Sequence, residues 1–183
     1  MKCWGYNYYG QLGIGNMTNM GDTADIMGDN LATVDLGTGR TAVDVSVGNQ
    51  FSCALLDNGD VKCWGRNQNG QLGIGNTTTM GDDADEMGDN LAAVDLGTGR
   101  TAVAIATGYW HACAILDNGD LKCWGDNDYG QLGIGNTTAM GDNAGEMGDN
   151  SSYTSLGTGL TPVHIDAGNS HTCAIFDNGS VKC

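Results

Sequence analysis

Seven cysteines are the residues of this 183-residue chain whose spacing most clearly indicates chemistry. They form two sets with a 60-residue period: Cys53, Cys113 and Cys173, and Cys3, Cys63, Cys123 and Cys183. The nine residues between Cys53 and Cys63 read as a hairpin with Asp57-Asn58-Gly59 as its three-residue loop. In that register the two cysteines form a non-hydrogen-bonded pair, whose Cα separation of about 4.5 Å a disulfide can span. We therefore predict three disulfides, Cys53–Cys63, Cys113–Cys123 and Cys173–Cys183, and an unpaired Cys3.

Two other uses of these cysteines stay open at the level of sequence. Buried free thiols often serve as small apolar side chains. Zinc is a weaker alternative, because the nine-residue gap lacks the short Cys-x-x-Cys clamp of structural zinc sites. Two sets that face each other in all three hairpins favour disulfides, and disulfides favour a location outside the cell or at its surface.

An acidic segment recurs in each period and is the candidate metal site. Closely spaced carboxylates among glycines and asparagines could supply the roughly six to eight oxygen ligands that calcium prefers. The spacing matches neither the EF-hand loop nor the glycine-rich β-roll repeat, so the alternative is a solvated acidic loop. The candidate calcium ligands are Asp22, Asp29, Asp82, Asp85, Asp89, Asp142 and Asp149.

Acceptor sequons for N-linked glycosylation stand at one position of the period. Asn16, Asn76 and Asn136 each begin an Asn-x-Thr triplet, and Asn150 begins Asn-Ser-Ser. These four asparagines are the candidate glycosylation sites. The alternative is ordinary turn chemistry, because asparagine after glycine is common in turns.

The chain lacks the motifs from which enzymes assemble an active site. No nucleophile elbow, Walker loop or His-Glu-x-x-His zinc motif occurs. His111 and His171 share one position of the period, but Phe51 occupies it in the first copy, so the position needs no shared chemistry. We expect a structural role for both histidines and a protein without enzymatic activity.

The composition narrows the class of partner. The chain has 22 Asp and Glu against 7 Lys and Arg, which gives a net charge of -15. Nucleic-acid binding depends on clustered cationic side chains, so we expect no nucleic-acid partner. No stretch approaches the ~18 apolar residues of a membrane helix, so we expect no membrane span.

The 60-residue period also predicts the architecture. It divides the chain into repeats 1–60, 61–120 and 121–180, with 181–183 opening a further copy. Such periods mark stacked or ring-forming repeats, in which each unit packs on its neighbours. In the second period we expect strands at 61–64, 91–96, 103–106 and 111–116, separated by glycine-rich turns and without helical periodicity. Four short strands per unit describe a β-propeller blade, so the expected fold is all-β.

The repeated motifs resemble those of a known family. Val-Lys-Cys-Trp-Gly-x-Asn-x-x-Gly-Gln-Leu-Gly and Gly-x-x-His-x-Cys-Ala-Ile-x-Asp-Asn-Gly are similar to the regulator-of-chromosome-condensation (RCC1) repeat, especially its cysteine-bearing variants in secreted or cell-surface proteins. The resemblance implies blades that close into a ring of about seven. Three blades are too few to close, so we expect an open arc or part of a larger ring or superhelical array.

Three functions remain in competition. Near-identical copies present one surface repeatedly and leave open edges, so the first hypothesis is an extracellular structural or adhesive scaffold that self-associates into a ring or filament. The second is a specific module for a protein or glycan ligand, similar to secreted propellers of the family that cap an enzyme. Such a module should vary one loop position with aromatic and arginine residues, whereas the variable positions here are mostly small or acidic. The third, small-GTPase exchange, is implied by the resemblance alone and would need reduced cysteines.

Overall fold

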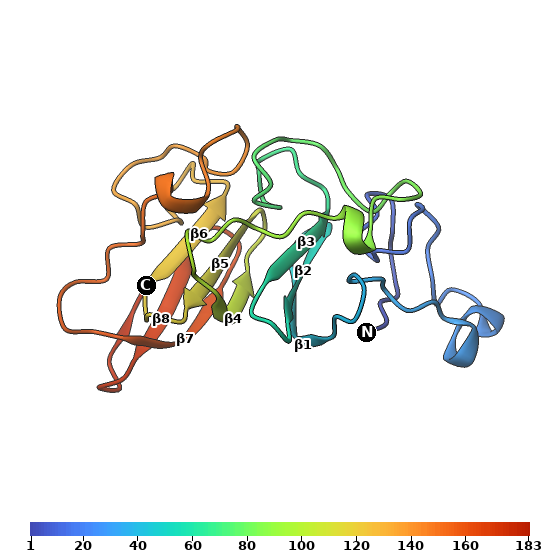
Figure 1. The fold of residues 1–183 in the computed structure, drawn as a ribbon, viewed down its shortest axis with the longest axis horizontal. Coiled ribbons are helices and arrows are strands. Elements are labelled where there is room, and N and C mark those ends of the chain that lie inside the picture. The colour runs from blue at the N-terminus through green and yellow to red at the C-terminus, as the bar shows by residue number, and fades with distance from the viewer.

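The computed structural model describes residues 1–183 and contains three antiparallel sheets of three strands, one sheet for each period (Figure 1). The strands are β1 (Ala42–Val47), β2 (Phe51–Leu56), β3 (Val61–Gly65), β4 (Ala102–Thr107), β5 (His111–Leu116), β6 (Leu121–Gly125), β7 (Pro162–Ala167), β8 (Thr172–Phe176) and β9 (Val181–Lys182). Four single-turn 3-10 helices complete the structure: η1 (Ala24–Ile26), η2 (Gly28–Asn30), η3 (Gly88–Asn90) and η4 (Gly148–Asn150). None of these helices is long or apolar enough to cross a membrane.

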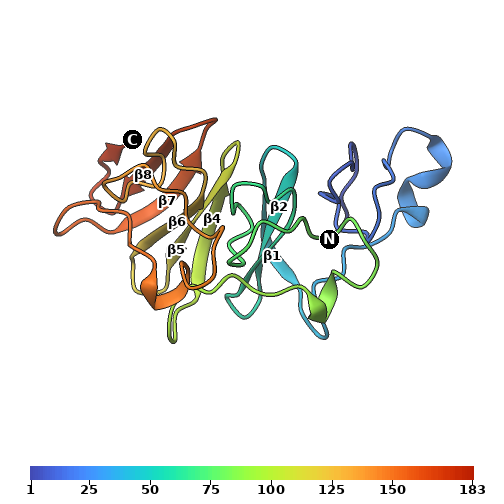
Figure 2. The ribbon, with the colours of Figure 1, turned by 90° about the horizontal axis from the view of Figure 1, so that it is seen from above.

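The sheets stand in a row, and the segment before β1 lies at one end of that row (Figure 2). Each sheet joins strands from both sides of a 60-residue boundary, because β2 ends at residue 56 and β3 begins at residue 61. Residues 1–41 therefore precede the first complete sheet.

The hairpins follow the predicted register. Leu55 pairs with Val61 and Cys53 with Cys63, and the Leu56 N–H donates to the Asp60 oxygen over 2.8 Å. Gly59 takes the left-handed conformation that the turn requires, with φ of 83°. The same pairing recurs in the second hairpin, where Cys113 pairs with Cys123. The expected all-β fold and hairpin register are confirmed.

The prediction of a fourth strand at 91–96 is wrong. The segment runs beside β3, but the only backbone hydrogen bond between them joins the Val94 N–H to the Val61 oxygen over 2.8 Å. The carbonyl of Asp95 instead accepts from Gly148 of the following repeat, and its carboxylate accepts from the Gly97 N–H. Because the turn and the neighbouring repeat use these groups, no regular ladder forms at the outer edge of the sheet.

The apolar core lies between successive sheets. One cluster joins Phe51 and Cys53 of β2 to Ile105 of β4 and Ala112 of β5. A second cluster joins Cys113 and Ile115 of β5 to residues of the third sheet. A single sheet therefore cannot bury its own apolar faces, and each repeat depends on its neighbours, as the period predicts.

Candidate functional site

The tryptophan of the Cys-Trp-Gly motif is held by the repeat that precedes it. Trp64 and Trp124 are fully buried, at 0% exposed, and their indole N–H groups donate to the backbone oxygens of Gln11 and Gln71 over 3.1 Å. A Cβ added to Gly73 would meet the Trp124 indole nitrogen at 2.8 Å, so only glycine leaves room for the ring. The Gln-Leu-Gly triplet is therefore a socket for the indole of the next repeat, and we call it the tryptophan socket.

A carboxylate joins the outer turns of neighbouring repeats. Asp89 of η3 accepts from the backbone N–H of Thr38 over 2.8 Å and from its hydroxyl over 2.6 Å. Asp149 of η4 accepts from Thr98 in the same way. These bonds stabilise the charged carboxylate and so hold the pKa of Asp89 below its ordinary value. The bond from the Thr38 hydroxyl contributes most, and the bond from its backbone N–H contributes next.

A lysine binds backbone oxygens at the same junction. The Lys62 ammonium donates to Leu36 of the preceding repeat over 3.1 Å and to Gly88 of its own repeat over 2.7 Å. The side chain of Lys62 is buried, so these bonds replace its contacts with water. In the third repeat, Lys122 binds the oxygen of Gly148 in the same way as Lys62 binds that of Gly88. The tryptophan, aspartate and lysine together define how one repeat attaches to the next.

Some carboxylates of the acidic loops cap turns, and the calcium hypothesis stays a prediction. No three carboxylate, imidazole or thiol groups gather in a way that could hold a metal ion. Asp89 and Asp149 bind threonines, and the Glu86 carboxylate accepts from the Gly81 and Asp83 N–H groups over 2.8 and 3.1 Å. The other candidates, Asp22, Asp29, Asp82, Asp85 and Asp142, join no metal-binding group either. Turn donors thus bind the carboxylates of Asp89, Asp149 and Glu86, whereas the Oδ1 atom of Asp142 is buried without a hydrogen-bond partner.

The face at the N-terminal end exposes groups that are buried at the internal junctions. Trp4 is 63% exposed, whereas Trp64 and Trp124 are buried. Val45 of β1 is 45% exposed, whereas its equivalents Ile105 and Ile165 are 8% and 4% exposed. Asp29 occupies the position of Asp89 but has no threonine partner. This end therefore presents one half of a repeat junction.

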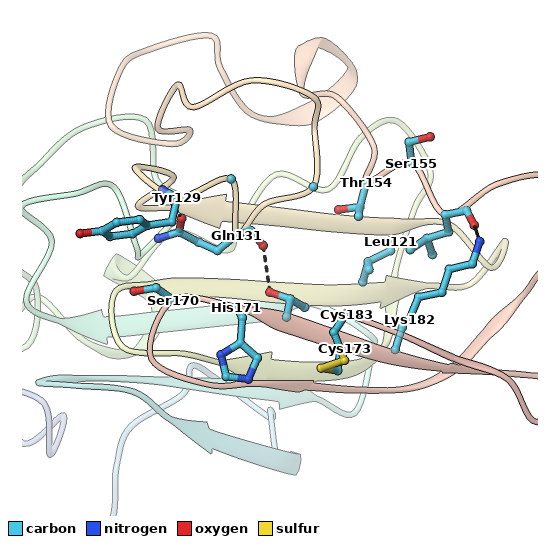
Figure 3. A pocket seen from close by; sticks show the side chains of 15 residues that line it. Leu121, Tyr129, Gln131, Thr154, Ser155, Ser170, His171, Cys173, Lys182 and Cys183 are labelled. Carbon is cyan, nitrogen blue, oxygen red and sulfur yellow. Dashed lines mark hydrogen bonds between the residues drawn. A yellow bond between two sulfur atoms is a disulfide. The ribbon is translucent and has the colours of Figure 1, made fainter.

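The face at the C-terminal end presents the other half. A pocket of about 390 Å³ is lined by Gln131, Gly133, Thr154 and Lys182, together with residues of β8 (Figure 3). Gln131 and Gly133 are the tryptophan socket of the third repeat, and no indole fills it. The Thr172 hydroxyl donates to the Gln131 oxygen over 2.9 Å. In the first repeat the Gln11 oxygen accepts both a hydroxyl and an indole N–H, so the Gln131 oxygen keeps a free lone pair for an indole.

Disulfides join the paired strands of every sheet. They link Cys53 to Cys63, Cys113 to Cys123 and Cys173 to Cys183, with Cα separations of 4.1, 4.0 and 4.0 Å. These are the pairs that the hairpin register predicts. Cys3 is free, and burial raises the pKa of its thiol.

The four sequon asparagines all lie on the surface. Asn16, Asn76, Asn136 and Asn150 are exposed. The side-chain oxygen of Asn76 accepts from the Thr78 N–H over 2.8 Å, and Asn16 and Asn136 cap the same turn in their repeats. The glycosylation hypothesis is compatible with this exposure and stays a prediction.

His111 has the structural position expected of it. Its ring is buried against Gly108, and its Nε2 atom lies 2.9 Å from the hydroxyl of Thr172 in the following sheet. Burial, with a smaller contribution from the charge of His171, lowers the pKa of His111 to about 4. The imidazole is therefore neutral at neutral pH and bridges two sheets.

A group of aromatic side chains was missed by the sequence analysis. Arg66 lies over the rings of Tyr9 and Trp110, and these two rings contact Tyr8 and Tyr109. Tyr6 stacks on Tyr8. The backbone N–H of Arg66 donates to the Gln50 oxygen over 2.8 Å, which places the loop after β3 beside the loop between β1 and β2. A position-by-position comparison of the repeats would have revealed these variable residues, but their proximity depends on the pairing of β2 with β3.

Two stretches of the chain match a described repeat family. Residues 42–71 and 102–131 match the Regulator of chromosome condensation (RCC1) repeat. Each stretch comprises one three-stranded sheet and the turn that leads into the tryptophan socket. The chain belongs to the RCC1 repeat family.

Curated relatives share this RCC1-family sequence over part of their length. The chain is 36% identical over 137 residues to the human E3 ubiquitin-protein ligase HERC2, a match that covers 75% of this chain and 2% of HERC2. It is 31% identical over 137 residues to the ultraviolet-B receptor UVR8 of Arabidopsis thaliana, which covers 74% of this chain and 27% of UVR8. The chain therefore spans only a small part of these relatives.

Solved RCC1 structures share the fold. The yeast RCC1 protein Prp20, in its complex with Kap60, superposes with a TM-score of 0.62 at 22% identity over 97% of this chain and 38% of Prp20. A second structure of Prp20p from Saccharomyces cerevisiae gives a TM-score of 0.60 at 18% identity, over 92% of this chain and 37% of that protein. At these identities the likeness concerns the fold alone, and it makes the three sheets part of a propeller.

Proposed function

We propose that this RCC1-family chain is a non-enzymatic, extracellular scaffold that extends by docking one copy's first repeat on another copy's third repeat. The complementarity of the two end faces carries the proposal. The N-terminal face offers an exposed indole, Trp4, and the C-terminal face offers the open socket of Gln131 and Gly133. The internal junctions supply the template, since both internal tryptophans fill such a socket.

Further groups at the two ends are complementary in the same sense. Asp29 of one copy would reach Thr158 of another, as Asp89 reaches Thr38 within the chain. The exposed Val45 would pack on Ile175 and Val181, whose equivalents in the internal sheets are buried. Burial of these apolar groups is the main favourable free energy of the contact. The contact is heterologous, so it closes into a ring or continues as a filament, depending on the rotation per blade.

Docking requires one short segment to move. Lys2 and Cys3 occupy the same position of the repeat as Lys182 and Cys183, so the two segments compete for one place in the joined structure. Val181 and Lys182 form β9, and Cys183 is held by a disulfide. Residues 1–3 belong to no strand and carry no disulfide. We therefore expect residues 1–3 of the incoming copy to be displaced.

The extracellular placement rests on the three disulfides. Disulfides form and persist in oxidising environments and are rare in the cytosol. One disulfide in every sheet supports secretion or display at the cell surface.

Light scattering of the purified 183-residue chain at micromolar concentration tests the scaffold. We expect a mass above that of the monomer, and we expect Trp4→Ala and Val45→Lys to return the protein to a monomer. Val43→Lys is the matched control, because Val43 and its equivalents Val103 and Val163 are exposed in all three sheets. A monodisperse wild-type monomer with cooperative unfolding, or assembly that survives Trp4→Ala, would overturn the proposal.

A protein-binding module is the second candidate, and the aromatic group around Arg66 favours it. Tyrosine, tryptophan and arginine dominate the energetically important residues of protein interfaces. The fold is shared with yeast RCC1, which was solved in complex with the protein Kap60. Partner binding at Arg66 and end-to-end assembly through Trp4 depend on different side chains, so variants at these two residues separate the two functions.

A further inference from the structure

In the loop after the Cys-Trp-Gly motif, positions that change in side-chain chemistry between the repeats lie next to positions that are identical in all three. The residue after Cys-Trp-Gly is Tyr6, Arg66 or Asp126, and the one two places later is Tyr8, Gln68 or Asp128. The asparagine between them and the following Gly-Gln-Leu-Gly-Ile-Gly-Asn are identical in all three repeats. Within this loop, variation therefore falls on side chains that an unchanging framework holds at fixed places.

Six of these variable side chains form one continuous ridge across the first two repeats. Tyr6 stacks on Tyr8 with centroids 6.3 Å apart, and Tyr8 meets Tyr9 edge-on at 5.0 Å. The Arg66 guanidinium lies 5.3 Å from the Tyr9 ring centre and 5.2 Å from that of Trp110. Trp110 meets Tyr109 at 4.8 Å. We call these residues the aromatic ridge: Tyr6, Tyr8, Tyr9, Arg66, Tyr109 and Trp110.

Hydrogen bonds between loops fix the ridge in place. The Asn49 N–H donates to the Tyr109 oxygen over 3.1 Å, and the Tyr109 N–H donates to the Asn169 oxygen over 3.2 Å. The loops between the first two strands of all three sheets are thus bonded in series. Tyrosine and tryptophan have few rotatable bonds, so a ridge on such a framework loses little entropy when it binds.

Arg66 is the one cation of the chain that neither pairs with a carboxylate nor binds a backbone oxygen. The four lysines donate to backbone carbonyls, and Arg40 and Arg100 pair with Asp57 and Asp117. Arg66 instead donates to the neutral side-chain oxygens of Gln50 and Gln68. These three bonds use three of its five N–H donors. The guanidinium is held in position and keeps two donors for a ligand.

The charge of the face changes sign along the row of repeats. The position of Arg66 and Gln68 is taken in the third repeat by Asp126 and Asp128. Asp126 is buried and accepts from the Gln131 amide over 2.8 Å, whereas Asp128 is exposed. This face thus presents the tyrosines of the first repeat, then the cation Arg66, then the exposed carboxylate of Asp128. A partner that matches this order needs an acidic group opposite Arg66 and a basic group opposite Asp128.

We propose that the aromatic ridge is the docking surface for a protein partner that places a carboxylate side chain on Arg66 and a basic side chain on Asp128. This inference deepens the second proposed function, on which it rests. The centre of the ridge is partly exposed and forms no hollow, since no pocket of the structure is lined by Tyr9, Arg66 or Trp110. Small ligands bind in concave sites, whereas a protein partner supplies its own complementary hollow.

Selection of peptides from a displayed random library on the full chain tests the proposal. We expect the selected peptides to share an acidic residue followed by a basic residue. Arg66→Gln should weaken the best peptide about 30-fold, the effect of losing an interface hot spot. Arg66→Glu should select peptides with a basic residue in place of the acidic one. Arg100→Gln is the matched control, because Arg100 lies outside the ridge and should leave the affinity unchanged.

Each other result overturns the proposal in a recognisable way. Peptides that bind Arg66→Gln as well as wild type would keep the protein-binding function and reject this surface. If no peptide is selected, and an array of acidic glycans binds in an Arg66-dependent manner, the partner is a glycan and not a protein. If neither library binds, protein binding itself is rejected, while light scattering still reports separately on end-to-end assembly.

Discussion

The buried imidazole of His111 makes stability depend on pH in a way that one substitution should remove. Phe51 occupies the position of His111 in the first sheet, and both rings pack against a glycine. His111→Phe therefore places in the second sheet a side chain that the same framework already accepts. It removes the titrating group together with the contact to the Thr172 hydroxyl.

The sign and size of the effect follow from proton linkage. Burial lowers the pKa of His111 from 6.5 to about 4, so the unfolded chain binds a proton between these values and the folded chain does not. The free energy of unfolding therefore falls as the pH drops below the unfolded pKa, and the loss levels off below the folded one. Between about pH 7 and about pH 4 this amounts to about 3 kcal/mol for the one group. For a chain of this length it corresponds to roughly 6 to 12 °C in melting temperature.

The assay is urea unfolding of wild type and His111→Phe at several pH values between these limits. The many carboxylates also titrate, so the measured quantity is the difference in pH dependence between the two proteins. His171→Phe is the control, because His171 is exposed in the third sheet and its substitution should leave most of the slope in place. A difference below about 1 kcal/mol between wild type and His111→Phe over this range would refute the reasoning.

Three further predictions concern the junctions, the disulfides and the acidic loops. Gly73→Ala should lower the free energy of unfolding, measured with a chemical denaturant, by about 1 to 3 kcal/mol more than Gly99→Ala does. Both glycines have φ near +67°, but only Gly73 contacts the Trp124 indole. Equal losses would show that the socket tolerates a methyl group. Non-reducing peptide mapping of protein from its natural source should link the three cysteine pairs and leave Cys3 out of them, and six free thiols would contradict the extracellular placement. Adding millimolar calcium or a chelator should leave the melting curve unchanged if Asp89 and Asp149 only cap turns, whereas a rise in melting temperature with calcium would support the calcium hypothesis.

The hairpins were predictable from sequence because their determinants are local. Asp57-Asn58-Gly59 specifies the turn, and the turn sets the register that brings Cys53 opposite Cys63. The blade architecture was predictable because the period is explicit in the chain. The sequence could not reveal that residues 91–96 form no outer strand, since the backbone oxygen of Asp95 accepts from Gly148 in the next repeat. Local propensity says nothing about that competition.

The roles of the acidic loop depended on residues far away in the chain. Asp89 reaches Thr38 across 51 positions, and nothing near Asp89 distinguishes a carboxylate that caps a turn from one that binds a metal. The aromatic ridge depended on distance in the same way. Tyr9 and Trp110 are linked through Arg66, which lies over both rings on a loop that β3 positions beside Gln50.

The distribution of variation between the repeats follows from what each position must satisfy. A junction residue serves two repeats at once: Trp124 must fill the socket of the preceding repeat, and Gly73 must leave room for its indole. Changing either residue alone leaves a cavity, a clash or an unpaired polar group, each of which costs free energy. Residues of the ridge have no such paired obligation, so they can differ between repeats without loss of stability. Repetition therefore keeps the tryptophan and its socket unchanged, while the ridge carries chemical diversity on a face that a partner can read.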